Sequence, residues 1–143
     1  MADPLYLKAP PDRKLIAIFI DHRDAFDSLR RMIVQDSQSY VSASHLDERL
    51  SVKRRDEYRN LISEIGAESI TPTSMRAVRF VFTGGGLSVI GPEWFKGIEY
   101  APEDIDRGGI VIGNLDQPRN LVEGQVYLRQ IEPHWYLFLQ KTD

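Results

Sequence analysis

The sequence predicts an α+β fold in which two N-terminal helices pack on one face of a five- or six-stranded antiparallel sheet. Apolar residues recur every third or fourth position before residue 70, as in helices, and at every second position after it, as in strands. The length of 143 residues is near the commonest size of one domain. We therefore expect one domain over 1–143, divided into an N-terminal arm (1–11), a helical half (12–66) and a β half (75–141).

The first periodic segment indicates one long amphipathic helix from Asp12 to Gln35, which begins after two prolines. Its seam is apolar except for one histidine and consists of Leu15, Phe19, His22, Phe26, Leu29 and Ile33. An alternative is a buried strand from Lys14 to Asp21, which would place Asp21 at a strand end, where catalytic acids are common. The period continues through Asp21 without a glycine turn, and this favours the helix.

A second helix is predicted to run through Ser51–Ile65, and Gly66 supplies the left-handed residue that ends many helices. Leu46 and Leu50 either extend this helix or form a separate turn before it. Its basic stretch around Lys53–Arg59 also contains acidic residues, which is typical of a solvated helix face with local ion pairs.

The β half begins after a polar boundary at Thr71–Ser74. The last two strands are expected to form a hairpin, with Pro133 and His134 as its tight connection. The expected strands are Arg76–Thr83, Leu87–Ile90 as its hairpin partner, Phe95–Tyr100, a central strand at Gly109–Ile112, and two final strands around Val126–Gln130 and Trp135–Leu139.

Composition and motifs exclude several functions. The net charge of −3 opposes nucleic-acid binding, and a chain without cysteine has no thiol nucleophile or cysteine-ligated metal. The three histidines lack the spacing of a zinc site, and Gly84–Gly86 joins two strands rather than a strand and a helix. We expect no metal, no cofactor and no membrane contact, since the longest apolar run is only Leu15–Ile20. The N-terminus lacks a signal-like region, which predicts a cytoplasmic protein.

The strand half combines acidic charge with aromatic side chains: from Phe80 onward, 9 acidic residues stand against 5 basic ones. This pattern favours a non-enzymatic protein-binding, adaptor or immunity-like domain with a basic protein partner. Tyr and Phe on the open sheet face are expected to support a homodimer. The predicted partner-binding residues are Trp94, Tyr100, Glu103, Asp104 and Asp106.

The alternative is a small-molecule-binding protein or hydrolase with a pocket between the helices and the sheet. In that case His22 or Asp21 would supply the acid–base group. The sequence contains no recognisable catalytic motif, so no catalytic residue is assigned.

Overall fold

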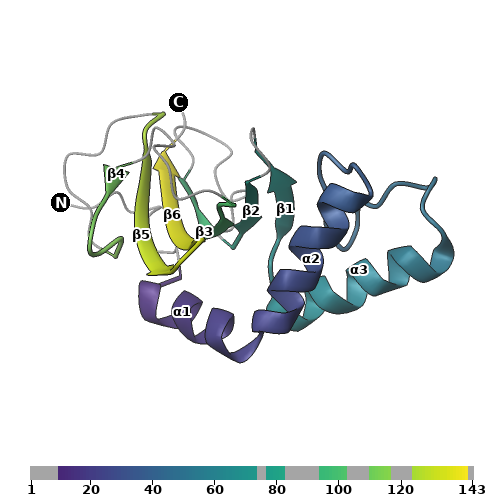
Figure 1. Ribbon diagram of the computed structural model, residues 1–143, viewed down its shortest axis with the longest axis horizontal. Helices are drawn as coiled ribbons and strands as arrows, with labels where there is room; N and C mark the ends of the chain where they lie inside the picture. Colours follow the sequence, from purple (N-terminus) through teal and green to yellow (C-terminus); the bar gives the residue numbers. More distant parts are fainter. Residues whose placement is uncertain (1–9, 74–76, 83–93, 103–109, 117–123, 142–143) are drawn as a thin grey trace.

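A computed structural model describes residues 10–73, 77–82, 94–102, 110–116 and 124–141 (Figure 1). The three helices are α1 (Asp12–Asp21), α2 (Arg23–Gln35) and α3 (Val52–Ile65). The strands are β1 (Ser69–Pro72), β2 (Val78–Val81), β3 (Trp94–Tyr100), β4 (Ile110–Val111), β5 (Val126–Glu132) and β6 (Trp135–Lys141).

One sheet contains all of these strands, in the order β1-β2-β3-β6-β5-β4. Five of them form an antiparallel sheet, and β4 alone joins in the parallel direction, beside β5. Figure 1 shows α1 alongside the β5–β6 end, α2 nearer β1 and β2, and α3 next to α2. The predicted α+β class, with helices packed on an antiparallel sheet, is confirmed.

The long N-terminal helix has the predicted outer limits but is broken at His22, so the prediction of one continuous helix is wrong. His22 has φ −130° and ψ 33°, and its N–H bonds to the carbonyls of Ile18 and Phe19 and ends α1. The break redirects the chain so that Phe19 and Phe26, one on each helix, both contact Trp135 of β6. The alternative strand over residues 14–21 is excluded, because this segment lies in α1.

The ends of α3 follow the predicted capping chemistry. The Ser51 side chain accepts a hydrogen bond from the Arg54 N–H, and Gly66 adopts the left-handed conformation with φ 77°. Leu50 lies in a separate turn before this cap rather than in the helix. A serine N-cap and a glycine C-cap therefore set the helix ends from local sequence alone.

Two predictions about the sheet need correction. The sheet begins earlier than expected, because Ser69–Pro72 forms β1 where a boundary was predicted, and Val41 adds a bridge to Ile70. The apolar Ile110–Val111 strand lies at the edge of the sheet rather than at its centre, and Val111 is 64% exposed. The final hairpin is confirmed, whereas the expected strand Leu87–Ile90 lies outside the described residues.

The main core lies between the helices and the sheet and is rich in aromatic rings. Phe26 of α2 packs edge-on against Phe80 of β2, with ring centroids 5.0 Å apart. On the opposite face of the sheet, Tyr136 and Phe138 are also buried, so neither ring is exposed to a second copy of the chain. The expected homodimer stays a prediction. No helix within the described ranges has the length and hydropathy that are needed to span a bilayer.

Candidate functional site

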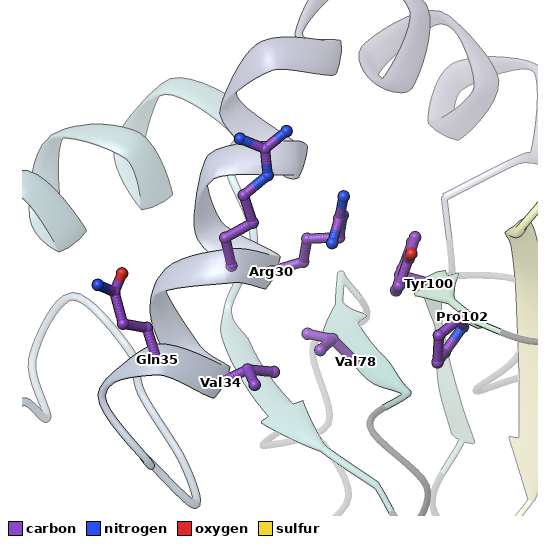
Figure 2. Close-up of a pocket in the computed structure, with 7 residues that line it drawn as sticks. Arg30, Val34, Gln35, Val78, Tyr100 and Pro102 are labelled. Carbon is purple, nitrogen blue, oxygen red and sulfur yellow. The ribbon is translucent and has the colours of Figure 1, made fainter.

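A cavity of about 370 Å³ opens between the second half of α2 and the adjoining ends of β2 and β3 (Figure 2). Its described lining residues are Arg30, Arg31, Val34, Gln35, Val78, Tyr100 and Pro102. We call this the α2–β3 cavity. Its volume is at the lower end of the range of small-ligand sites, which is roughly 300–1,000 Å³.

The α2–β3 cavity is built by one helix face and one strand pair. Arg30 and Val34 are four residues apart on α2 and therefore lie on the same side of the helix. Val78 and Tyr100 are directly paired between β2 and β3 and share the face of the sheet that the helices cover. The site thus depends on the packing of α2 on the sheet.

Arg30 and Tyr100 form the central contact of the α2–β3 cavity. The guanidinium carbon of Arg30 lies 4.2 Å from the centroid of the Tyr100 ring, within the range of a cation–π interaction. Figure 2 shows the Arg30 side chain extending from α2 toward this ring. Trp135 packs edge-on against Tyr100 at 5.0 Å, so the ring is fixed from two sides.

Asp27 holds both arginines of the cavity in place. Its Oδ1 accepts a hydrogen bond from Arg30 Nε at 2.7 Å, and its Oδ2 pairs with Arg31 one turn away. These are the i,i+3 and i,i+4 spacings at which helical side chains meet. Two guanidinium groups and one carboxylate leave one net positive charge at the rim.

The remaining surface of the α2–β3 cavity is mostly apolar. Val78 is fully buried, whereas Val34 is one of the few large apolar side chains with substantial exposure, at 44%. Pro102 has no backbone N–H to donate. The cavity therefore combines a cationic rim with an aliphatic floor.

A second charged cluster lies at the start of α1 and is centred on two side chains that are closed to solvent; we call it the Asp12 cluster. The side chains of Asp12 and Lys96 are each only 1% exposed, and Lys96 Nζ lies 2.8 Å from Asp12 Oδ1. Asp12 Oδ2 also accepts hydrogen bonds from Arg129 Nη1 at 2.9 Å and from the Leu115 N–H at 2.8 Å. Lys96 also pairs with Asp116 at 3.3 Å.

The Asp12 cluster has a structural explanation. Burial acts to raise the pKa of Asp12, but the hydrogen bonds from Lys96, Leu115 and Arg129 outweigh it and the pKa is lowered. The charged form of the Asp12 carboxylate is thus stabilised at its buried position. The cluster ties the first residue of α1 to β3, β5 and the segment around Leu115, and Asp12 and Lys96 present no surface to a ligand.

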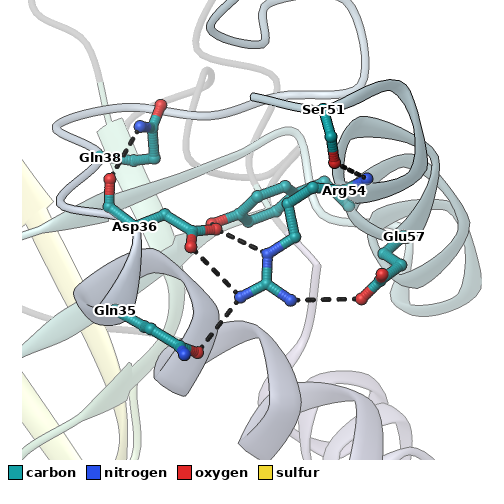
Figure 3. Close-up of polar contacts among 7 residues, drawn as sticks. Gln35, Asp36, Gln38, Ser51, Arg54 and Glu57 are labelled. Atoms are coloured by element: carbon teal, nitrogen blue, oxygen red, sulfur yellow. Dashed lines mark hydrogen bonds and ion pairs between the residues drawn. The ribbon is translucent and has the colours of Figure 1, made fainter. Parts of the chain in front are cut away.

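A third cluster, the Asp36 cluster, joins the end of α2 to α3 (Figure 3). Asp36 Oδ2 accepts hydrogen bonds from Arg54 Nε and from the Tyr58 hydroxyl, both at 2.7 Å. Burial opposes the charge on Asp36, yet these two donors lower its pKa. Burial, followed by the neighbouring Asp36, raises the pKa of Tyr58. Arg54 also contacts Gln35 of the cavity, so this cluster holds α3 beside the site.

One of the five predicted partner-binding residues is placed in the α2–β3 cavity, namely Tyr100. Trp94 begins β3 opposite Lys141, and its side chain is not among those described. Glu103, Asp104 and Asp106 lie outside the described residues. Their predicted role therefore stays a prediction.

Sequence reasoning missed Arg30, Arg31 and Val34, which lie off the apolar seam of the predicted first helix. Val34 carried a signal, because an apolar residue beside the seam and one turn after Arg30 widens the apolar face. No pattern in the sequence showed that Tyr100 would meet Arg30, since 70 positions separate them.

The proposed acid–base residues of the hydrolase alternative lie elsewhere. His22 Nδ1 pairs with Glu64 at 3.0 Å on the exposed side of the helices, and Asp21 is exposed. Neither residue lines the α2–β3 cavity. His134, in the β5–β6 turn, contacts the Ala101 carbonyl through Nδ1 at 2.9 Å.

The chemistry of the α2–β3 cavity is therefore that of anion recognition beside an apolar surface. Within the described ranges, no group of three or more His, Cys, Asp or Glu side chains is arranged to hold a metal ion. The described lining residues supply guanidinium donors, the Gln35 amide, one tyrosine and aliphatic groups, but no imidazole or carboxylate. Comparison of the chain with protein-family models, curated proteins and solved structures finds no match.

Proposed function

We propose that this chain is a non-enzymatic protein-binding module that docks an acidic, aliphatic segment of a partner protein in the α2–β3 cavity. The observation that carries the proposal is the Arg30 guanidinium, stacked on Tyr100 at the rim of an apolar-floored cavity. A charge-assisted hydrogen bond to an immobilised arginine is stronger than one between neutral groups. Such a rim selects an anionic group, and the floor selects an aliphatic one.

The composition of the lining supports binding rather than catalysis. Asp27, the carboxylate that pairs with Arg30 and Arg31, is neutralised by them, so it is a poor general base. Asp12 and Asp36 are engaged by buried or half-buried partners, and neither lines the cavity. The cavity therefore offers fixed arginine N–H donors and an apolar surface that a ligand can cover.

The charge of the site favours an acidic partner segment, in contrast to the basic partner expected from the sequence. That expectation depends on the acidic residues after Pro102, which lie outside the described residues. The described rim carries one net positive charge. Charge complementarity then favours an acidic segment at this position.

Fluorescence anisotropy with labelled peptides tests the proposal. The protein is titrated into three pools of nonapeptides, all with free carboxyl ends and all rich in aliphatic residues. The remaining residues are acidic in the first pool, neutral in the second and basic in the third. We expect the acidic pool to bind most tightly and Arg30→Ala to weaken it by about tenfold or more, the equivalent of one charge-assisted hydrogen bond.

The matched control is Arg59→Ala on α3, which removes an exposed arginine that pairs with Asp56 within its own helix. This variant should bind the acidic pool as the wild type does. Equal binding of the acidic and basic pools, or an equal loss in both variants, would overturn the proposal, because net charge rather than the cavity would then explain binding.

A small-molecule ligand is the second candidate, and the cavity volume of about 370 Å³ favours it. The hydrolase form of this alternative has no described acid–base group in the cavity. A small acid that displaces the acidic peptides and binds more tightly than they do would support this candidate.

A further inference from the structure

The charge and the lining of the α2–β3 cavity indicate which chemical group it binds, and this inference rests on the binding role proposed above. We infer that the cavity receives the C-terminal residue of a partner chain, with a single carboxylate at Arg30 and an aliphatic side chain against the exposed side chain of Val34, which lies beside the buried Val78.

The first step of the argument is the charge at the rim. Arg30 and Arg31 share Asp27, so the three groups together carry one positive charge. One carboxylate neutralises this charge, whereas a phosphate group, at −1.5 to −2 near neutral pH, leaves an excess of negative charge. The rim is matched to a monoanion.

The second step is the geometry of Arg30. Asp27 engages Nε and Nη2, and within the described part of the chain no hydrogen bond or ion pair involves Nη1. The stack on Tyr100 fixes the plane of the guanidinium. The unpaired N–H groups of Nη1 thus present a preorganised donor edge, which suits a planar carboxylate.

The third step concerns the apolar partner of the carboxylate. One face of the Tyr100 ring is covered by Arg30, and Trp135 contacts the same ring edge-on. The His134 ring also lies near it, at 6.1 Å between centroids, so an aromatic ligand would have to compete with these neighbours for the Tyr100 ring. Val34, 44% exposed and beside the buried Val78, instead offers a β-branched surface for an aliphatic side chain.

The fourth step distinguishes a chain end from an acidic residue within a chain. An internal segment must enter and leave the cavity, and its buried peptide groups then need hydrogen-bond partners. Val34, Val78 and Pro102 contribute only apolar side chains, and Gln35 contributes the one side-chain amide among the described lining residues, too few partners for a chain that passes through. A chain end brings its carboxylate and its last side chain from the same Cα and leaves no continuing backbone to satisfy.

The test compares one acidic hexapeptide ending in leucine with the same peptide carrying a C-terminal amide. Binding is followed on the full chain by the NMR signals of Arg30 Nε–H and of the Val34 and Val78 methyl groups. We expect the free carboxylate to bind about tenfold more tightly than the amide and to shift these signals. In Arg30→Lys, which keeps the charge but lacks the planar fork, the preference for the free carboxylate should shrink.

Three further arms overturn the inference in distinguishable ways. Equal binding of the amidated and free peptides would show that internal acidic residues suffice, so the proposed function would survive and the inference would fail. Displacement by inorganic phosphate at lower concentration than by acetate would contradict the monoanion. Tighter binding of 4-methylpentanoate than of the hexapeptide would assign the site to a free acid. Binding of no acidic peptide at all would remove the proposed function itself.

Discussion

The Asp12 cluster and the rim of the α2–β3 cavity each pair carboxylates with two cationic side chains, yet their surroundings differ. In the Asp12 cluster the central side chains are 1% exposed, and Asp12 receives hydrogen bonds from two other elements. At the rim, Asp27 lies on the same helix as both arginines, and the Arg31 side chain is 66% exposed. The first arrangement joins distant parts of the fold, and the second holds donors at a surface.

This difference suggests a way to separate charges that hold the fold together from charges that are available to a ligand. A buried charge must be compensated by fixed partners, because the cost of removing it from water is otherwise several kcal/mol. A charge at the mouth of a cavity keeps part of its hydration and retains donors for a ligand. Exposure and the number of satisfied donors therefore indicate the role better than residue type does.

The largest effect that we expect comes from Asp12→Asn. This change leaves Lys96 and Arg129 facing an uncharged amide, and loss of one member of a buried ionic cluster typically costs about 3–5 kcal/mol. Urea unfolding at pH 7 measures the loss. The control is Asp24→Asn, an exposed acidic residue in the first turn of α2, which should cost less than about 1 kcal/mol. Equal losses would show that the Asp12 cluster is not structural.

Asp36→Asn tests a cluster that is intermediate in burial. At pH 7 it should cost about 1.5–3 kcal/mol, the range for hydrogen bonds to a charged group. Because the pKa of Asp36 is lowered in the folded chain from 3.8, its stabilisation is present above that value and lost as pH falls through the folded pKa. The difference between wild type and variant should therefore hold down to about pH 5 and shrink at pH 3. A difference that grows toward acid pH would contradict the cluster.

A double variant sharpens the account of the Asp12 cluster. Asp12→Leu alone removes the 2.8 Å ion pair of the buried Lys96 and leaves its contact with Asp116, whereas Asp12→Leu with Lys96→Met removes both charges of that pair. We expect the pair to be less destabilising than the sum of the single changes, by roughly 0.5–3 kcal/mol, the range for coupled neighbours. Urea unfolding of the three variants gives this coupling energy. Strict additivity would mean that the two side chains do not interact.

Arg30→Ala should have the smallest effect on stability. Its side chain is 25% exposed and its main contacts are an ion pair on its own helix and the Tyr100 ring, so we expect a loss of at most about 1 kcal/mol. The same urea experiment measures it, with Arg59→Ala as the matched control. A loss comparable with that of Asp12→Asn would place Arg30 in the structural class and weaken the proposed binding role.

Much of the fold could be predicted from local sequence. The ends of α3 depend on Ser51 and Gly66, and the last hairpin depends on alternation around Pro133 and His134; both are confirmed. The break at His22 could not be predicted, because the apolar spacing continues across it and only the packing of Phe19 and Phe26 on Trp135 requires it. Predictions that depend on local capping and period succeed, and those that depend on distant contacts do not.

The candidate site was predicted only at Tyr100. An aromatic residue at a strand end is visible in the sequence, but its environment is set by α2 and by the pairing with Val78 and Trp135. Similarly, Lys96 looks like an ordinary surface lysine until β3 places it beside Asp12. The α2–β3 cavity and the Asp12 cluster both bring together side chains from distant segments. The spacing of residues along one segment carries no information about such contacts.

By itself the sequence determined the fold class, the existence of most helices and strands, and the final hairpin. These follow from hydrophobic period, capping residues and turn residues, which act over a few neighbouring positions. Only the tertiary structure decided which face of α2 met the ends of β2 and β3, and which charges became enclosed. Packing of the helices on a twisted sheet brings together residues far apart in the chain, and the physical state of each charge follows from that packing rather than from its neighbours in sequence.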